Sequence, residues 1–167
     1  TIYEYRLSNQ LRVLFVPRHQ AKVLTYQTWF RVGSVDEKQD QKLKKTGLAH
    51  LFEHMMFRGT SKYPDGKFDE ISSRIGSDKQ NATTYFYRTN YFQNVPSSRL
   101  SQIAELESDR MQSLNIIPEV LEKEKGAVVG ELRRSLDNPN RAAWNELLST
   151  VFQTAPYQWT VLGTEEE

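Results

Sequence analysis

The sequence contains no cysteine and only three histidines among its 167 residues. Without cysteine the chain cannot form disulfides, bind zinc through thiolates or use a cysteine nucleophile. Charge of one sign is not in excess either, because 22 Lys and Arg residues stand against 21 Asp and Glu residues. This balance predicts no nucleic-acid partner. No apolar run approaches the roughly 20 residues of a membrane-spanning helix, so no membrane span is expected.

The length and patterning of the chain predict one domain of mixed α and β structure. Alternating and β-branched stretches predict strands at residues 2–7, 11–16, 23–32, 83–87 and 91–95. Apolar residues at helical spacing predict helices at residues 67–75, 98–113, 118–135 and 140–152. Residues 33–45 are polar and predict a loop. This order favours an α+β fold with two layers, in which helices cover a mainly antiparallel sheet.

Two of the three histidines lie on a further predicted helix, which begins after an N-cap at Thr46 and ends near Gly59. His50, Glu53 and His54 share one face, since residues three and four apart are neighbours on a helix. The adjoining stripe is apolar and comprises Leu48, Leu51, Phe52 and Met55. We therefore expect this helix to be buried nearly all round.

Burying two imidazoles and a carboxylate costs about 2–7 kcal/mol for each polar group without a partner. A zinc ion would satisfy both imidazoles, since neutral histidines at i and i+4 can reach one metal at about 2.0–2.1 Å. The alternative is that one histidine packs in the core while the other is exposed. The pattern His-x-x-Glu-His on an apolar helix favours the zinc site.

This helix resembles the H-x-x-E-H signature of the inverzincins, and within them the pitrilysin (M16) family of zinc metallopeptidases, in its bacterial branch. The matching residues are His50-Leu51-Phe52-Glu53-His54, preceded by Gly47-Leu48-Ala49 and followed by Met55-Met56-Phe57-Arg58-Gly59-Thr60. Two further segments are similar to the family's turn before the active helix and to its substrate-pairing edge strand, namely Gly33-Ser34-Val35-Asp36-Glu37 and Asn81-Ala82-Thr83. The resemblance covers nearly the whole chain and implies a processing-peptidase-like metallohydrolase fold.

The resemblance implies a third ligand, a glutamate about 75 residues after the second histidine, and Glu131 stands 77 positions after His54. Glu124 matches the family's companion acid, which is expected to orient a ligand or contact substrate. The glycines at 126 and 130 weaken the predicted helix, and we expect them where another helix approaches closely. The alternative is that Glu131 is an ordinary solvated residue.

The resemblance implies a zinc endopeptidase that hydrolyses short or unfolded polypeptides with one Zn²⁺ per chain. His50, His54 and Glu131 would hold the metal, and Glu53 would act as general base on the zinc-bound water. A non-catalytic or partner-dependent subunit of a peptidase complex stays open as the alternative.

The same resemblance implies that residues 1–167 form a single domain, most of the first, metal-bearing repeat of a larger peptidase. The lid that completes the family's site would then lie elsewhere, in the same polypeptide or in a partner subunit, and the chain alone is expected to be inactive. A periplasmic or exported location in a bacterium is favoured over the cytoplasm.

Overall fold

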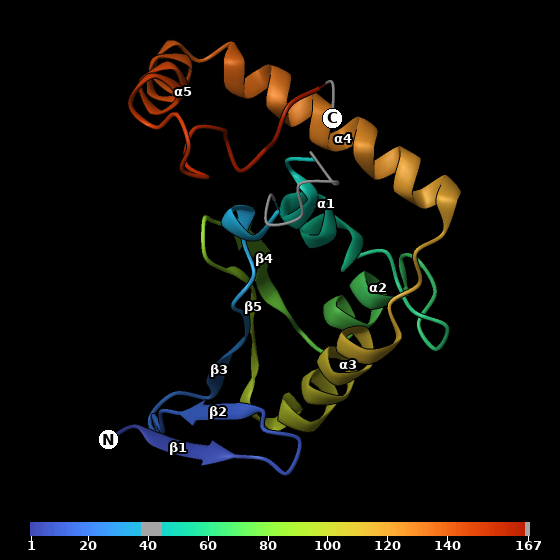
Figure 1. Ribbon diagram of the computed structural model, residues 1–167. Coiled ribbons are helices and arrows are strands. Elements are labelled where there is room, and N and C mark those ends of the chain that lie inside the picture. The colour runs from blue at the N-terminus through green and yellow to red at the C-terminus, as the bar shows by residue number, and fades with distance from the viewer. Residues whose placement is uncertain (38–44, 166–167) are drawn as a thin grey trace.

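The computed structural model describes residues 1–37 and 45–165 (Figure 1). Its strands are β1 (Tyr3–Arg6), β2 (Arg12–Phe15), β3 (Val23–Phe30), β4 (Asp78–Thr84) and β5 (Thr89–Pro96). Its helices are α1 (Leu48–Met55), α2 (Lys67–Arg74), α3 (Leu100–Ser113), α4 (Pro118–Leu136) and α5 (Pro139–Val151), with short 3-10 turns η1 (Ser34–Asp36) and η2 (Ser97–Arg99). The predicted loop at 33–45 contains η1, and residues 38–44 of it lie outside the described part of the chain.

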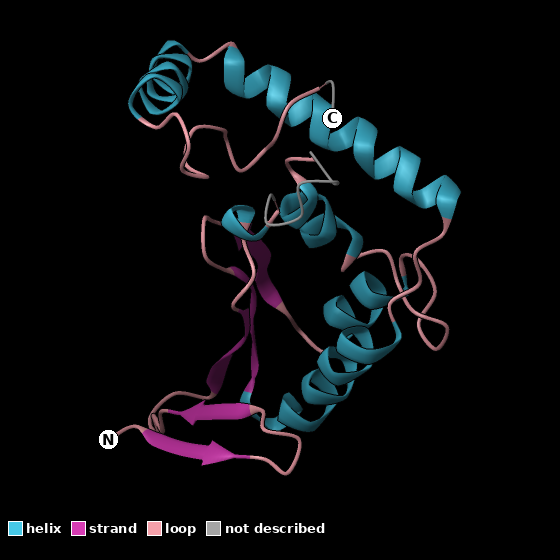
Figure 2. Ribbon diagram, viewed as in Figure 1, coloured by secondary structure: helices cyan, strands magenta, loops and turns pink. Residues whose placement is uncertain are grey.

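The strands form antiparallel sheets, as predicted (Figure 2). One has the order β3-β5-β4, so that β4 is an edge strand, and β1 and β2 form a separate hairpin. Helix α3 contacts β3 and β5, whereas α1 contacts both β4 and α4. Figure 1 shows the consequence: α1 lies between the end of the sheet and the long helix α4. Within the described residues, no helix combines the length and apolarity needed to cross a membrane.

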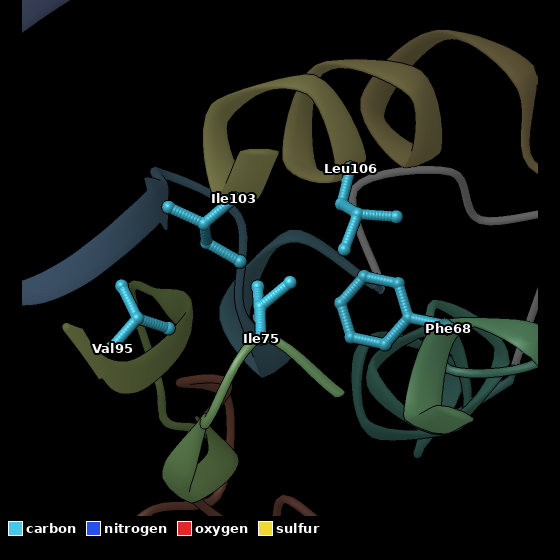
Figure 3. Packing of buried hydrophobic residues seen from close by; sticks show 5 residues of the cluster. All are labelled: Phe68, Ile75, Val95, Ile103 and Leu106. Atoms are coloured by element: carbon cyan, nitrogen blue, oxygen red, sulfur yellow. The ribbon is translucent and has the colours of Figure 1, made fainter. Parts of the chain in front are cut away.

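The main core joins α2 and α3 to the sheet (Figure 3). Its buried residues are Phe68, Ile75, Val95, Ile103 and Leu106. A second, smaller cluster beneath α1 consists of Met56, Ala82 and Tyr91. The second cluster fixes α1 on β4 and β5, and thereby sets the position of the histidine helix.

A buried ion pair on α3 connects the two clusters. Arg110 Nη2 lies 2.8 Å from Glu107 Oε2, and both side chains are 3% exposed. The guanidinium stacks 4.5 Å from the ring centroid of Tyr91 and 4.7 Å from that of Phe68. Glu107 also accepts a hydrogen bond from Thr28 Oγ1 on β3 at 3.0 Å. The pair is therefore held by the sheet and the aromatic core, although Arg110 Nη1 has no hydrogen-bond partner among the described residues.

The antiparallel pair β4–β5 differs from the predicted strands in its first strand. Its first strand is Asp78–Thr84 rather than residues 83–87, because the chain turns between Tyr85 and Arg88. The aromatic residues in the turn have high strand propensity, but the carbonyls of Tyr85 and Phe86 accept hydrogen bonds from η1 at 3.2 and 3.0 Å. That tertiary contact prevents β4 from continuing.

Candidate metal centre

Helix α1 begins after a glycine and is capped by a residue outside the helix. Gly47 precedes it with φ of 83°, a conformation that favours glycine. The Glu37 carboxylate accepts hydrogen bonds from the backbone N–H groups of Gly47 and Ala49 at 2.9 and 2.7 Å. The expectation of Thr46 as N-cap is therefore wrong, since a glutamate before the helix in sequence provides the acceptor. The helix also ends at Met55, earlier than predicted.

The polar face of α1 is buried, together with Met55 of the apolar stripe, which is 1% exposed. His50 and Glu53 are each 8% exposed, whereas Phe52 is 52% exposed and Leu48 is 36% exposed. The expectation that α1 is buried nearly all round is therefore wrong within the described residues. Hydrophobic periodicity identified the two faces correctly, but it did not show which of them packs against α4 and β4.

Three nitrogen and oxygen donors from α1 and α4 converge on one point. Glu131 Oε2 lies 3.5 Å from His50 Nε2, and Glu131 Oε1 lies 3.9 Å from His54 Nε2. One ligand atom from each of the three residues lies within 4.8 Å of the other two. The structure thus brings together residues that are 77 positions apart in sequence.

The geometry of these donors fits a tetrahedral zinc ion. Ligands about 2.0–2.2 Å from such an ion are about 3.4 Å from one another. Glu131 Oε2 and His50 Nε2 are 3.5 Å apart, and one ligand atom of each residue lies within 4.8 Å of the others. Two neutral imidazoles and one carboxylate are also a donor set that zinc accepts with one position left open. The side chains present therefore suit zinc without a change of fold.

Glu124 orients one of the imidazoles. This residue is 1% exposed, and its Oε2 lies 3.3 Å from His54 Nδ1, while its Oε1 pairs with Arg58 Nε at 2.8 Å. Because a carboxylate accepts only, this contact holds the proton on Nδ1 and leaves the Nε2 lone pair directed toward Glu131. Arg58 compensates the buried negative charge.

The environment of His50 favours the neutral form of its imidazole, which is the form that binds a metal ion. Burial lowers the pKa of its imidazole, and the neighbouring His54 lowers that pKa further, against a smaller opposing effect of Glu131. The buried Nδ1 of His50 has no hydrogen-bond partner among the described residues. A metal on Nε2 would offset part of the cost of burying this ring, although it would not pair with Nδ1.

Glu53 lies on the same face but outside the converging group of donors. Thr84 Oγ1 at the end of β4 donates a hydrogen bond to its Oε2. Burial raises the pKa of Glu53, while the Thr84 hydrogen bond and His54 act in the opposite direction. A carboxylate with a raised pKa takes up a proton more readily at neutral pH than an exposed one.

A cleft of about 510 Å³ opens over these residues. One wall is β4, where Asn81 is exposed and Ala82 is buried. Asn81 Oδ1 accepts a hydrogen bond from the N–H of Ala82 at 2.9 Å. Asn81 and Ala82, the two residues predicted to bind substrate, thus lie on the edge strand of the sheet and line the same cleft as the three converging side chains.

Several residues of the cleft were not singled out from the sequence, namely Thr84, Arg141, Val161 and Leu162. Thr84 directly follows the Asn81-Ala82-Thr83 segment that resembles the family, and its position there could have identified it from the sequence. The others lie on α5 and the segment after it, and only the folded chain brings them to α1.

The prediction that another helix approaches α4 closely at Gly126 and Gly130 is wrong. A Cβ atom added at Gly126 or Gly130 would have no neighbour within 4 Å among the described residues. Helix α4 contacts α1 through Glu124 and Glu131, rather than through its glycines.

An α+β domain with two histidines and a glutamate meeting across two packed helices defines a class, the zinc-protease-like domains. The family described as Insulinase (Peptidase family M16) matches residues 12–165, and the chain belongs to this family.

The similarity extends to named relatives. The zinc protease PqqE of Helicobacter pylori is 32% identical over 159 residues, which cover 94% of this chain and 35% of that protein. The crystal structure of a protease from Helicobacter pylori superimposes with a TM-score of 0.92 at 31% identity, covering 99% of this chain and 39% of the other. The chain therefore spans little more than a third of the length of these relatives.

A more distant structure shares the fold alone. The structure described as a peptidase M16 inactive domain from Pseudomonas fluorescens has a TM-score of 0.86 at 17% identity, covering 99% of this chain and 39% of the other. The same architecture is thus found in structures described as a protease and as an inactive domain, so the fold alone does not determine activity and the side chains of the site do.

Proposed function

We propose that this domain is the metal-bearing part of a zinc-dependent endopeptidase acting on short or unfolded polypeptides. The supporting observation is the convergence of His50, His54 and Glu131, with Glu53 beside them and not among them. Zinc bound to these three ligands would supply a Lewis acid and lower the pKa of a water molecule in its open position.

The chain's own residues would perform the remaining tasks. Glu53 would take a proton from the attacking water on its carboxylate and transfer it to the departing amine. Glu124 would hold His54 in the orientation and tautomer that ligation requires. A peptide would pair with the open edge of β4 at Asn81 and Ala82, which places its backbone along the cleft.

The proposal is tested by Glu53→Gln in the full-length protein. Peptide cleavage should fall by about 10²–10⁴-fold, the usual contribution of a general base. Zinc measured by elemental analysis should stay near one per chain, because the donors are untouched. Glu70→Gln, on the exposed surface of α2, is the control that should leave both unchanged. Cleavage unaffected by Glu53→Gln would refute the mechanism.

The rival function is a non-catalytic or partner-dependent subunit, and a structure of this fold is described as a peptidase M16 inactive domain. The presence of all four residues, Glu53 and the three donors, favours the enzyme. We also propose that the domain is the first repeat of a larger peptidase whose lid lies elsewhere, so that the 167 residues alone have little activity. Export or a periplasmic location belongs to the same proposal and rests on the bacterial resemblance.

A further inference from the structure

The cleft continues past Glu131 into a second cavity of about 390 Å³. The second cavity is lined by the end of α4, the start of α5 and the segment after it, namely Glu131, Arg134, Ser135, Asn138, Arg141 and Leu162. Glu131, Arg141 and Leu162 line both spaces, so the second cavity is an extension of the first.

Two arginines bring uncompensated charge to this extension. Arg134 and Arg141 are exposed, and neither guanidinium has a hydrogen bond or an ion pair to another described residue. Arg133, the neighbour of Arg134 on α4, lines neither cavity and instead pairs with Glu165. The Glu131 carboxylate is directed to the two histidines of α1. The cations at the cavity are thus available to a ligand.

Helix electrostatics account for only one of these arginines. Arg134 lies near the C-terminus of α4, where the partial negative charge of the helix favours a cation. Arg141 lies in the first turn of α5, where an acidic residue is favoured, and this turn has none. The Asn138 side chain accepts hydrogen bonds from the N–H groups of Asn140 and Arg141, so the positive charge left for an anion at this cavity is that of the two guanidiniums.

We propose that Arg134 and Arg141 bind a carboxylate of the peptide substrate and give the domain a preference for acidic substrates. The inference rests on the proposed peptidase function. Arginine binds carboxylates through two parallel N–H···O bonds, and the cavity adjoins the converging donors through Glu131. The carboxylate would belong to an Asp or Glu side chain near the scissile bond, or to a free peptide C-terminus.

Matched peptides test this preference in the full-length protein. One series places Glu or Gln at each position around the scissile bond, with both peptide ends blocked; a second compares free and amidated C-termini. At one position, or at the C-terminus, kcat/KM should be about tenfold higher for the carboxylate, the order expected for a partly exposed charge-assisted contact. The ratio should decrease as salt is added.

The double variant Arg134→Gln/Arg141→Gln should bring that ratio to about one. Lys123→Gln removes the same kind of charge from an exposed site on α4 outside both cavities, and it should retain the full ratio. A ratio near one for every wild-type pair, or a ratio that survives in the double variant, would overturn the proposal.

Peptide binding separates this inference from the proposed function. Fluorescence anisotropy of the same labelled peptides with the Glu53→Gln protein should show a similar preference in affinity, lost in the arginine double variant. Arginine-dependent binding of acidic peptides by a wild type that cleaves nothing would contradict only the peptidase. Cleavage and binding without acidic preference would contradict only the role of Arg134 and Arg141.

Discussion

Glu124 Oε2 lies 3.3 Å from Nδ1 of His54, and Glu124 Oε1 lies 2.8 Å from Nε of Arg58. The buried carboxylate thus joins one imidazole of the candidate metal centre to the cation that compensates the carboxylate's charge. His50, the other imidazole, has no corresponding contact at its Nδ1 among the described residues. The two histidines are therefore oriented by different means, one by a carboxylate and the other by burial.

Glu124→Gln should weaken zinc binding by about 10–100-fold, the usual effect of removing a partner that orients a ligand. The amide keeps the shape of the side chain but provides a single acceptor oxygen for His54 and Arg58. Affinity is measured by competition with a chromophoric chelator. Glu122→Gln, exposed on the same helix and paired with Lys125, is the control. Equal affinity of Glu124→Gln and wild type would show that Glu124 does not orient His54.

Zinc should stabilise the full-length protein, and removing it with a chelator should lower the melting temperature. A ligand present at about 100 times its Kd contributes about 2.7 kcal/mol to the free energy of unfolding. In Glu131→Gln the difference between zinc-loaded and chelated protein should shrink, because one donor is lost, whereas Glu119→Gln on α4 should keep it. An undiminished difference in Glu131→Gln would exclude Glu131 as a ligand.

Ile103→Ala should lower the free energy of unfolding by about 2–5 kcal/mol. Ile103 is 0% exposed and lies at the centre of the α2–α3–sheet core, so truncation leaves a cavity. Ile116→Ala, at a residue that is 50% exposed, should cost far less. Urea unfolding followed by tryptophan fluorescence measures both, and similar losses for the two variants would contradict the packing described.

Gly126→Ala and Gly47→Ala should change stability in opposite directions. Gly126 is helical with open space around it, so alanine should raise the free energy of unfolding by up to about 1 kcal/mol. Gly47 has φ of 83°, and a Cβ there would lie 2.7 Å from the carbonyl oxygen of Leu162. Alanine at 47 should cost about 1–3 kcal/mol. A loss of stability in Gly126→Ala would indicate that another part of the protein packs on that face.

The sequence predicted those features that depend on short spacing. His50, Glu53 and His54 form one face because the i, i+3, i+4 geometry of a helix is local. The element order and the antiparallel sheet were also accessible from alternation and turn residues. Glu131 could be assigned only through the family resemblance, because nothing local distinguishes it from other glutamates on α4.

The remaining features depend on contacts between distant segments. Glu37 caps α1 from outside the helix, and Thr84 reaches Glu53 only when β4 lies beside it. The exposure of Phe52 could not be predicted either, since periodicity distinguishes faces without showing which neighbour each receives. Arg58 lies in the segment that resembles the family, but its ion pair with Glu124 could not be predicted because the two residues are far apart in sequence.

Helix α1 has eight residues, too few to be helical in isolation, since helices shorter than about 12–15 residues are marginal in water. Its geometry therefore depends on Glu37 before it and on the close contact of Gly47 with Leu162 after it. A newly synthesised chain would present its two histidines as separate, weak ligands until both segments are in place. Metal acquisition would then follow folding rather than guide it, and unfolded copies would compete poorly for scarce zinc.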